Sequence, residues 1–287
     1  MESDKFYEDI NKKYNGQYLT ILNDLLQVQE NTSLLESKIE TLAALKLLQG
    51  QVEKNEKKDH YGNVYHFYYV SIPMLDIIEV MAQDVPLDWL FYVLKSLGKK
   101  GIKKIYKRGW SNYTMYGNIW YKNDTLFIEY IPDTEKLYNK EINQLYTKLY
   151  APILLSFQTV EGLYLYKLLK SYAYIIEQND HVIIELSLYF ELNDLIVMLG
   201  FIDKKQADDK RKKIKSIFIS GGADQGLLYN NWDSFRMKVL EPGIKEINRL
   251  SDLYVSRFEP KTGDDKDEEI VGVTISVQGN KDYKPFC

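Results

Sequence analysis

The sequence has few residues that could form disulfides or metal sites. Among its 287 residues there is one cysteine, Cys287, and there are three histidines. A single cysteine can form neither an internal disulfide nor a cysteine-based zinc site. No two of the histidines His60, His66 and His181 are separated by one residue, which argues against the His-hydrophobic-His metal site of nicking and rejoining endonucleases. We therefore expect no metal and no cofactor.

Motifs for nucleotide binding and catalysis are also missing. There is no GxxxxGK[ST] loop, and "SGGADQG" (220–226) has glycines without the lysine and hydroxyl that hold phosphate and magnesium. Acid pairs such as Asp264 and Asp265 fall in an expected turn, and nothing places a base against a nucleophile. We therefore expect a protein that is not an enzyme.

Long hydrophobic runs are absent. The longest, "LIVMLGFI" (195–202), is far shorter than the roughly 20 residues that a membrane-spanning helix needs. The segment "MESDKFYEDI" (1–10) has no signal-peptide hydrophobic core. We expect a cytoplasmic protein with no membrane partner.

Arginine is scarce, and the charges are unevenly distributed. The formal net charge is -4, and five of the 37 basic residues are arginines. Seven basic residues without an acid lie in 95–108, and a second basic run lies in 204–215. One such run is ordinarily a solvated surface, but two at similar places in similar segments favour phosphate binding. Few arginines with many Tyr, Asn and Ile residues favour an AT-rich target, although codon usage in a low-GC genome produces the same composition.

One arrangement of secondary structure occurs twice. In the first half, a helix (33–49) precedes a strand, two short helices that begin at prolines, and three β-rich pieces with expected turns at "GWSN" and "KND". After residue 150, a helix, a strand, a helix, a second helix (232–250) and a strand pair (253–277) follow. Recurrence at about 130 residues indicates two copies of one domain type.

Helices followed by a β-hairpin are typical of winged-helix domains, whose last helix enters the DNA major groove. We therefore predict an α+β fold with two tandem winged-helix domains, residues 31–150 and 151–280, and a tail, 281–287. Residues 1–30 are an N-terminal extension, expected to be an extra helical segment; a dimer contact and disorder stay open for it.

The segment 235–250 is a candidate DNA-reading helix. At 100° per residue, one arc carries Phe235, Val239, Leu240, Gly243, Ile244, Ile247 and Leu250, and the other carries Lys238, Glu241, Lys245, Asn248 and Arg249. Lysine and arginine can bond guanine, asparagine can bond adenine, and all three can bind phosphate. An ordinary amphipathic helix has the same pattern. Pro242 predicts an interruption of this helix.

The helix expected at 87–97 is its counterpart in the first half. The pattern predicts that Leu87, Leu90, Phe91, Val93, Leu94 and Leu97 are buried and that Asp88, Tyr92, Lys95 and Ser96 are exposed. The basic run continues this surface with Lys99, Lys100, Lys103, Lys104, Lys107 and Arg108. Because lysine is a flexible point charge, this surface suits phosphates better than bases.

In "GLYLYKLLKSYAY" (162–174), helical spacing predicts that Leu165, Leu168, Leu169 and Tyr172 are core residues. The tyrosines could instead stack on bases.

Three segments resemble the plasmid replication initiators that bind iterons through two winged-helix domains. They are "TVEGLYLYKLLKSY" (159–172), "FRMKVLEPGIKEINRLSDLYVSRFEPKTG" (235–263) and the stretch 128–157 that joins the two domains. The Ile-x-Glu-Ile-Asn element at 244–248 is the most specific part. Two features depart from the family: "PKTGDDKDEE" (260–269) is acidic where the family commonly has a basic wing, and the first thirty residues match nothing in it.

The resemblance implies that monomers bind repeated sites in double-stranded origin DNA, open adjacent AT-rich DNA and help to load host proteins such as the initiator and the helicase. It also implies that dimers repress their own gene, which contributes to plasmid copy control. Arg236 and Lys238 stand where the family usually has basic residues. Helical phase, however, places Arg236 on the apolar arc, so Lys238, Lys245 and Arg249 are the better candidates.

Three other functions stay open at this point. The chain could be a tandem winged-helix transcription regulator, a nucleic-acid enzyme with an unrecognised acidic site, or a structural or protein-interaction protein whose basic runs are merely solvated.

Overall fold

The computed structural model describes ten stretches of the chain: 2–22, 33–58, 60–99, 101–106, 109–114, 116–130, 146–177, 185–199, 232–263 and 270–283. The chain divides into two compact units. The first contains Met1–Ile21, Ser33–Gln144 and Tyr150–Ser156, and the second contains Leu22–Thr32, Leu145–Leu149 and Phe157–Cys287. Residues 151–156 therefore belong to the first unit, beyond the predicted boundary at residue 150.

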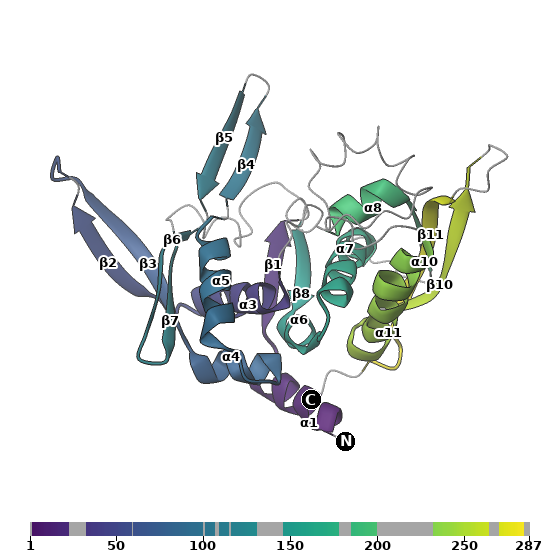
Figure 1. Ribbon diagram of the computed structural model, residues 1–287, viewed down its shortest axis with the longest axis horizontal. Coiled ribbons are helices and arrows are strands. Elements are labelled where there is room, and N and C mark those ends of the chain that lie inside the picture. Colours follow the sequence, from purple (N-terminus) through teal and green to yellow (C-terminus); the bar gives the residue numbers. More distant parts are fainter. Residues whose placement is uncertain are drawn as a thin grey trace. The chain divides into compact units, whose positions relative to one another are not determined.

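The first unit combines helices with a four-stranded antiparallel sheet in the order β2-β3-β7-β6. Its helices are α1 (Glu2–Tyr14), α3 (Leu34–Leu48), α4 (Met74–Met81), α5 (Leu87–Leu97) and α6 (Ala151–Ser156). Its sheet strands are β2 (Glu53–Lys58), β3 (Val64–Pro73), β6 (Tyr116–Lys122) and β7 (Thr125–Tyr130). Outside this sheet lie β1 (Tyr18–Leu22), β4 (Gly101–Tyr106) and β5 (Gly109–Thr114), and β8 (Tyr146–Tyr150) belongs mainly to the second unit. Figure 1 shows α3, α4 and α5 on the same side of this sheet.

The core of the first unit lies between α3 and the sheet. Ile39 and Leu42 of α3 are buried, and so are alternate residues of β3 and β7, namely Val70, Ile72, Leu126, Ile128 and Tyr130. This alternation is the period of two that places every second side chain on one face of a strand. Helix α3 begins at Ser33, whose hydroxyl accepts a hydrogen bond from the Glu36 N–H at 3.2 Å.

The turns of the first unit differ partly from the prediction. The "KND" turn between β6 and β7 is confirmed: Asn123 and Asp124 have positive φ angles of 51° and 52°, as a two-residue hairpin turn requires. The turn predicted at "GWSN" is wrong, because residues 109–112 lie in β5 and pair with β4 in the register Tyr106↔Gly109. Strands β4 and β5 have six residues each, and a turn at 109–112 would remove four of the β5 residues that pair with β4.

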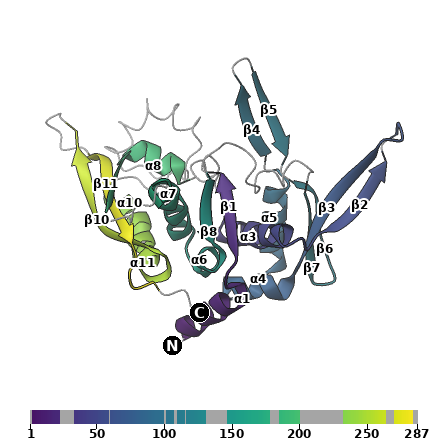
Figure 2. The same cartoon turned by 180° about the vertical axis from the view of Figure 1, so that it is seen from behind.

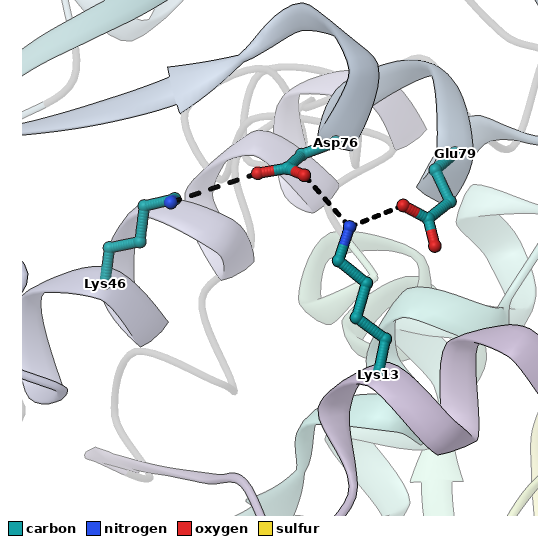
Figure 3. A network of polar contacts seen from close by, with 4 residues as sticks. All are labelled: Lys13, Lys46, Asp76 and Glu79. Carbon is teal, nitrogen blue, oxygen red and sulfur yellow. Dashed lines mark hydrogen bonds and ion pairs between the residues drawn. The ribbon is translucent and has the colours of Figure 1, made fainter.

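Helix α1 is the predicted extra helical segment, and an ion-pair network attaches it to α4 (Figure 3). Lys13 donates hydrogen bonds to Asp76 Oδ1 at 2.9 Å and to Glu79 Oε2, and Lys46 of α3 lies 3.9 Å from Asp76 Oδ2. Burial lowers the pKa of Lys13, but the hydrogen bonds to Glu79 and Asp76 outweigh it, so that the pKa is raised overall. Burial raises the pKa of the neighbouring Tyr14 to about 12.

The second unit has a three-stranded antiparallel sheet in the order β10-β11-β9. Its first two helices are α7 (Val160–Glu177) and α8 (Leu192–Met198). A continuous helical stretch follows, formed by α10 (Trp232–Phe235), the π-helix η2 (Arg236–Leu240) and α11 (Glu241–Leu250). The strands are β9 (Leu186–Glu191), β10 (Leu253–Thr262) and β11 (Ile270–Gly279), and Figure 2 shows α7, α11, β10 and β11 from behind.

The two units share one topology. Among the described residues of each, a helix precedes a strand, further helices and a hairpin whose last strand lies between its partner and that first strand. The first unit adds β2 before β3 and the β4–β5 pair before β6. The order is β3-β7-β6 in the first unit and β9-β11-β10 in the second. The prediction of two tandem winged-helix domains is confirmed. In the part of the chain that is described, no helix is both long and apolar enough to cross a membrane.

Helix α7 supplies the core of the second unit. Leu165, Leu168 and Leu169 are buried as predicted, and Tyr172 is half-buried, with its ring edge-on to Phe190 at 5.7 Å. Tyr164 and Tyr166 of the same helix are also buried. These two rings are therefore not available for stacking on bases.

Helices α7 and α11 meet where both carry glycine. A Cβ placed on Gly243 would lie 3.4 Å from the Cα of Gly162, so the two backbones are in close contact. The buried carboxylate of Glu246 accepts hydrogen bonds from the N–H groups of Gln158 and Thr159 and from the Thr159 hydroxyl. Thr159 Oγ1 in turn accepts the N–H of Gly162 at 3.1 Å. Glu246 thus completes the N-terminal cap of α7 from a different helix, where its charge also suits the helix dipole.

We expect Gly162→Ala to destabilise the second unit by about 1–3 kcal/mol, as overpacking does in a close-packed interior. The added Cβ would lie 2.8 Å from Thr159 Oγ1 and would also collide with the Glu246 carboxylate. Gly279→Ala is the control, since nothing lies within 4 Å of a Cβ there. Urea denaturation of both variants tests this, and equal stability of the two would contradict the close contact.

The α1 network predicts a loss of stability at alkaline pH. The pKa of Tyr14 is raised from 10.0 to about 12 on folding, so above pH 10 the unfolded chain loses the Tyr14 proton first and unfolding is favoured. The raised pKa of Lys13 acts in the same direction, because its stabilisation is lost as pH rises. We expect the free energy of unfolding to fall between pH 10 and about 12, and to fall less in Tyr14→Phe. The exposed Tyr61→Phe is the control and should follow the unmodified protein.

Candidate nucleic-acid interface

The helix that the sequence predicts over 232–250 contains one widened turn. In η2 the N–H of Glu241 bonds the carbonyl of Arg236, five residues earlier. Pro242 follows immediately. A proline ring collides with the carbonyl four residues before it, here that of Lys238, and cannot donate to it. The π turn accommodates both effects, so that Pro242 modifies the helix without ending it.

One face of this helix is exposed and mainly basic. Lys238, Lys245 and Arg249 are exposed, together with Glu241 and Pro242. The opposite face is buried through Phe235, Val239, Leu240, Gly243, Ile247 and Leu250, as the helical pattern predicted, while Ile244 is half-buried. The structure therefore brings three of the predicted DNA-binding residues onto one solvent-facing strip.

Asn248 has a different environment from these three. Its side-chain amide donates to the carbonyl of Val255 at 3.0 Å and accepts the Val255 N–H at 2.6 Å. Asn248 is half-buried and joins the end of α11 to the beginning of β10. Because donor and acceptor are both engaged with backbone, we leave Asn248 out of the proposed DNA contacts.

Arg236 lies between two acids of its own helix. Its guanidinium is 3.5 Å from Asp233 Oδ1 and 3.6 Å from Glu241 Oε1, and 39% of its side chain is exposed. This intermediate position agrees with the helical phase, which placed Arg236 nearer the apolar arc. Contact with a phosphate would require Arg236 to leave at least one of these acids.

Two further contacts fix the C-terminal end of α11. Asp252, in the turn after the helix, accepts a hydrogen bond from the Tyr166 hydroxyl at 3.0 Å and pairs with the buried Lys170 at 2.8 Å. The sequence analysis did not identify Asp252. It included Glu246 in the Ile-x-Glu-Ile-Asn element but assigned it no role, and the sign of its burial was that an acid falls among the apolar positions of the helix.

The hairpin β10–β11 follows the helix, as a wing would. On β10, Arg257 pairs with Glu259 at 2.7 Å, and this hydrogen bond lowers the pKa of the Glu259 carboxyl. Most of the acidic segment 260–269, from residue 264 on, and the basic run at 204–215 lie outside the described residues. Within those residues, no three histidine, cysteine or acidic side chains gather closely enough to hold a metal ion.

Seven predicted DNA-binding residues lie in the basic run of the first unit, and the structure describes the exposure of two of them. Lys95 of α5 and Lys99 just after it are exposed. Lys103 and Lys104 lie in β4, in register with Asn112 and Ser111. The other three basic residues of the run, Lys100, Lys107 and Arg108, lie outside the described part of the chain.

The predicted burial of Leu87 and Phe91 on α5 is wrong. Both are exposed, by 61% and 64%, whereas Leu90, Val93 and Leu97 are buried. These three positions form a stripe about 60° wide at 100° per residue. Helix α5 packs on α3 and β6 mainly along this stripe, with Leu94 half-buried beside it, and the sequence does not reveal how wide the neighbouring surface is.

Comparison with known proteins supports the winged-helix assignment. Residues 221–277 match the family model described as "Initiator Rep protein, WH2". The resemblance to initiator Rep proteins is confirmed. The matched residues include the helical stretch Trp232–Leu250 and most of the β10–β11 hairpin, and therefore the exposed basic strip.

A solved structure has the same fold over nearly the whole chain. It is the crystal structure of the Pi initiator protein in complex with iteron DNA, with a TM-score of 0.60 and 14% sequence identity. The match covers 92% of this chain and 98% of the Pi chain. No curated protein sequence matches the chain. The likeness of fold to Pi therefore extends beyond the residues that the family model matches.

We expect Asn248→Ala to destabilise the second domain, while Lys245→Ala does not. Removal of the amide leaves the N–H and carbonyl of Val255 without these partners, at a cost of about 1–3 kcal/mol. Lys245 is exposed one turn away, so its loss should change stability by less than about 0.5 kcal/mol. Thermal unfolding of both variants distinguishes these roles. If Asn248→Ala is as stable as the unmodified protein, the bonds to Val255 do not define the role of this side chain, and Asn248 becomes a candidate DNA contact again.

Proposed function

We propose that this protein is a plasmid replication initiator that binds repeated sites in double-stranded origin DNA. The observation that carries the proposal is the strip formed by Lys238, Lys245 and Arg249. It lies on the last helix of a winged-helix domain that matches the initiator Rep family, which is the position from which such domains enter the major groove. The Pi structure was solved with iteron DNA, which supports repeated sites as the target.

The two domains contribute different contacts. In the second domain, Lys238, Lys245 and Arg249 contact base edges and phosphates, and Arg236 is a secondary contact that its two acids restrain. In the first domain, Lys95 and Lys99 hold the phosphate backbone, and the same role extends along the run to Lys100, Lys103, Lys104, Lys107 and Arg108.

Binding to the repeats serves initiation without a catalytic site in the protein itself. The bound monomers promote opening of adjacent AT-rich DNA and loading of the host initiator and helicase. Dimers of the same chain repress its gene and so limit plasmid copy number. All of these steps occur in the cytoplasm.

Selection of duplexes from a random pool by the purified protein tests the target directly. We expect enrichment of one site of roughly one to two helical turns, since two groove-reading domains span about that length. The same site should occur as direct repeats beside the gene. A single inverted site without repeats would instead indicate a transcription regulator, and no enrichment in monomer or dimer fractions would overturn sequence-specific binding.

Base-reading and phosphate-binding residues should respond differently to substitution. We expect Lys238→Ala and Arg249→Ala to reduce the preference for the selected site over random DNA by about 5- to 150-fold. Lys99→Ala should weaken binding to both equally and reduce the slope of log K against log salt by about 0.9.

Titrations at several salt concentrations measure both effects. Lys54→Ala, an exposed lysine of β2 outside the basic run, is the control and should change neither quantity. Equal, sequence-independent losses in all three variants would contradict the role of the second-domain helix.

A further inference from the structure

Helix α5 of the first domain carries apolar side chains on its solvent-exposed surface. Leu87, Phe91 and Tyr92 are 61%, 64% and 70% exposed. The rings of Phe91 and Tyr92 lie edge to face, with centroids 6.4 Å apart. Exposed apolar side chains that are contiguous on a surface mark sites of interaction.

The topology gives α5 the same place in its unit that the helix Trp232–Leu250 has in the second. It is the last helix before the strand pair whose second strand, β7, occupies the middle of the sheet. In a winged-helix domain this helix enters the major groove. The exposed rings therefore stand on the element that faces base edges.

The charges at the two ends of α5 fit this orientation. Lys95 and Lys99 are exposed at the C-terminal end and suit phosphates. Asp88 is exposed at the N-terminal end, where a carboxylate can accept a hydrogen bond from cytosine N4. The rings of Phe91 and Tyr92 lie between these ends.

Among the groups that base pairs present in the major groove, the apolar one is the C5-methyl group of thymine. We propose that α5 reads thymine by burying this methyl group against Phe91, with Tyr92 beside it. The inference rests on the proposed function and deepens it, because it assigns base recognition to the first domain as well.

A protein groove fits this surface less well than DNA does. Helices that dock into such grooves carry apolar anchors at i, i+4 and i+7 or i+8. On α5, Leu87 and Phe91 occupy positions i and i+4. Position i+7 is the half-buried Leu94, and position i+8 is the charged Lys95. The apolar surface ends after one turn, and a cation follows it.

Replacement of thymine by deoxyuridine tests the contact, because it removes the methyl group and keeps the base pair. In the selected duplex, each thymine is replaced in turn and the full-length protein is titrated. We expect about fourfold weaker binding for each buried methyl removed, at one or two thymines. With Phe91→Ala the same replacements should have no effect, and with Phe91→Leu, which keeps an apolar contact, part of the effect should remain.

Trp89→Ala is the matched control on the same helix. Trp89 is 53% exposed, but at 100° per residue it points about 160° away from Phe91. This variant should keep the full effect of thymine replacement. Lys245→Ala, in the second domain, should bind the selected duplex more weakly but should show the full effect of thymine replacement.

The outcomes separate this inference from the proposed function. If no duplex is enriched, both fail. If a duplex is enriched but every thymine replacement has the same effect with and without Phe91, the methyl contact is overturned while the initiator function stands. Unchanged DNA binding by Phe91→Ala, with loss of self-association in sedimentation, would also overturn it and would make this surface a contact between protein chains.

Discussion

The geometry of the second domain depends on the contact between the Glu246 carboxylate and the first turn of α7. A buried carboxylate is tolerated because the N–H groups of Gln158 and Thr159 and the Thr159 hydroxyl all donate to it. The contact is possible because Gly162 and Gly243 let the two helices approach without side chains between them. Helix α11 is therefore held directly on the helix that forms the core.

Two other constraints orient the same helix. At its C-terminal end, Asn248 bonds both backbone groups of Val255, which couples the helix to β10 and hence to the wing. Near its middle, the π turn before Pro242 sets the rotation of Lys238 relative to the residues that follow. A helix fixed in tilt and rotation presents its exposed cations in one register, which sequence recognition requires.

The two domains share a topology but differ in the surface of the last helix. The second domain exposes lysine and arginine, which suit guanine and phosphate, and the first exposes Phe91 and Tyr92 between charged ends. Duplicated folds commonly carry different recognition chemistry, because the buried stripe that maintains the fold is separate from the exposed residues that bind. In this chain, Leu90, Val93 and Leu97 maintain the helix position whichever ligand the opposite side binds.

The sequence by itself determined the main helices, the two tandem winged-helix domains and the exposure of Lys238, Lys245 and Arg249, because these follow from local periodicity. Only the tertiary structure decided the roles of Asn248 and Glu246 and the exposure of Phe91. Helical phase shows which way a side chain points, but whether it meets backbone, another helix or water depends on elements distant in the sequence. An asparagine that could bond adenine instead bonds Val255, since folding brings β10 within reach.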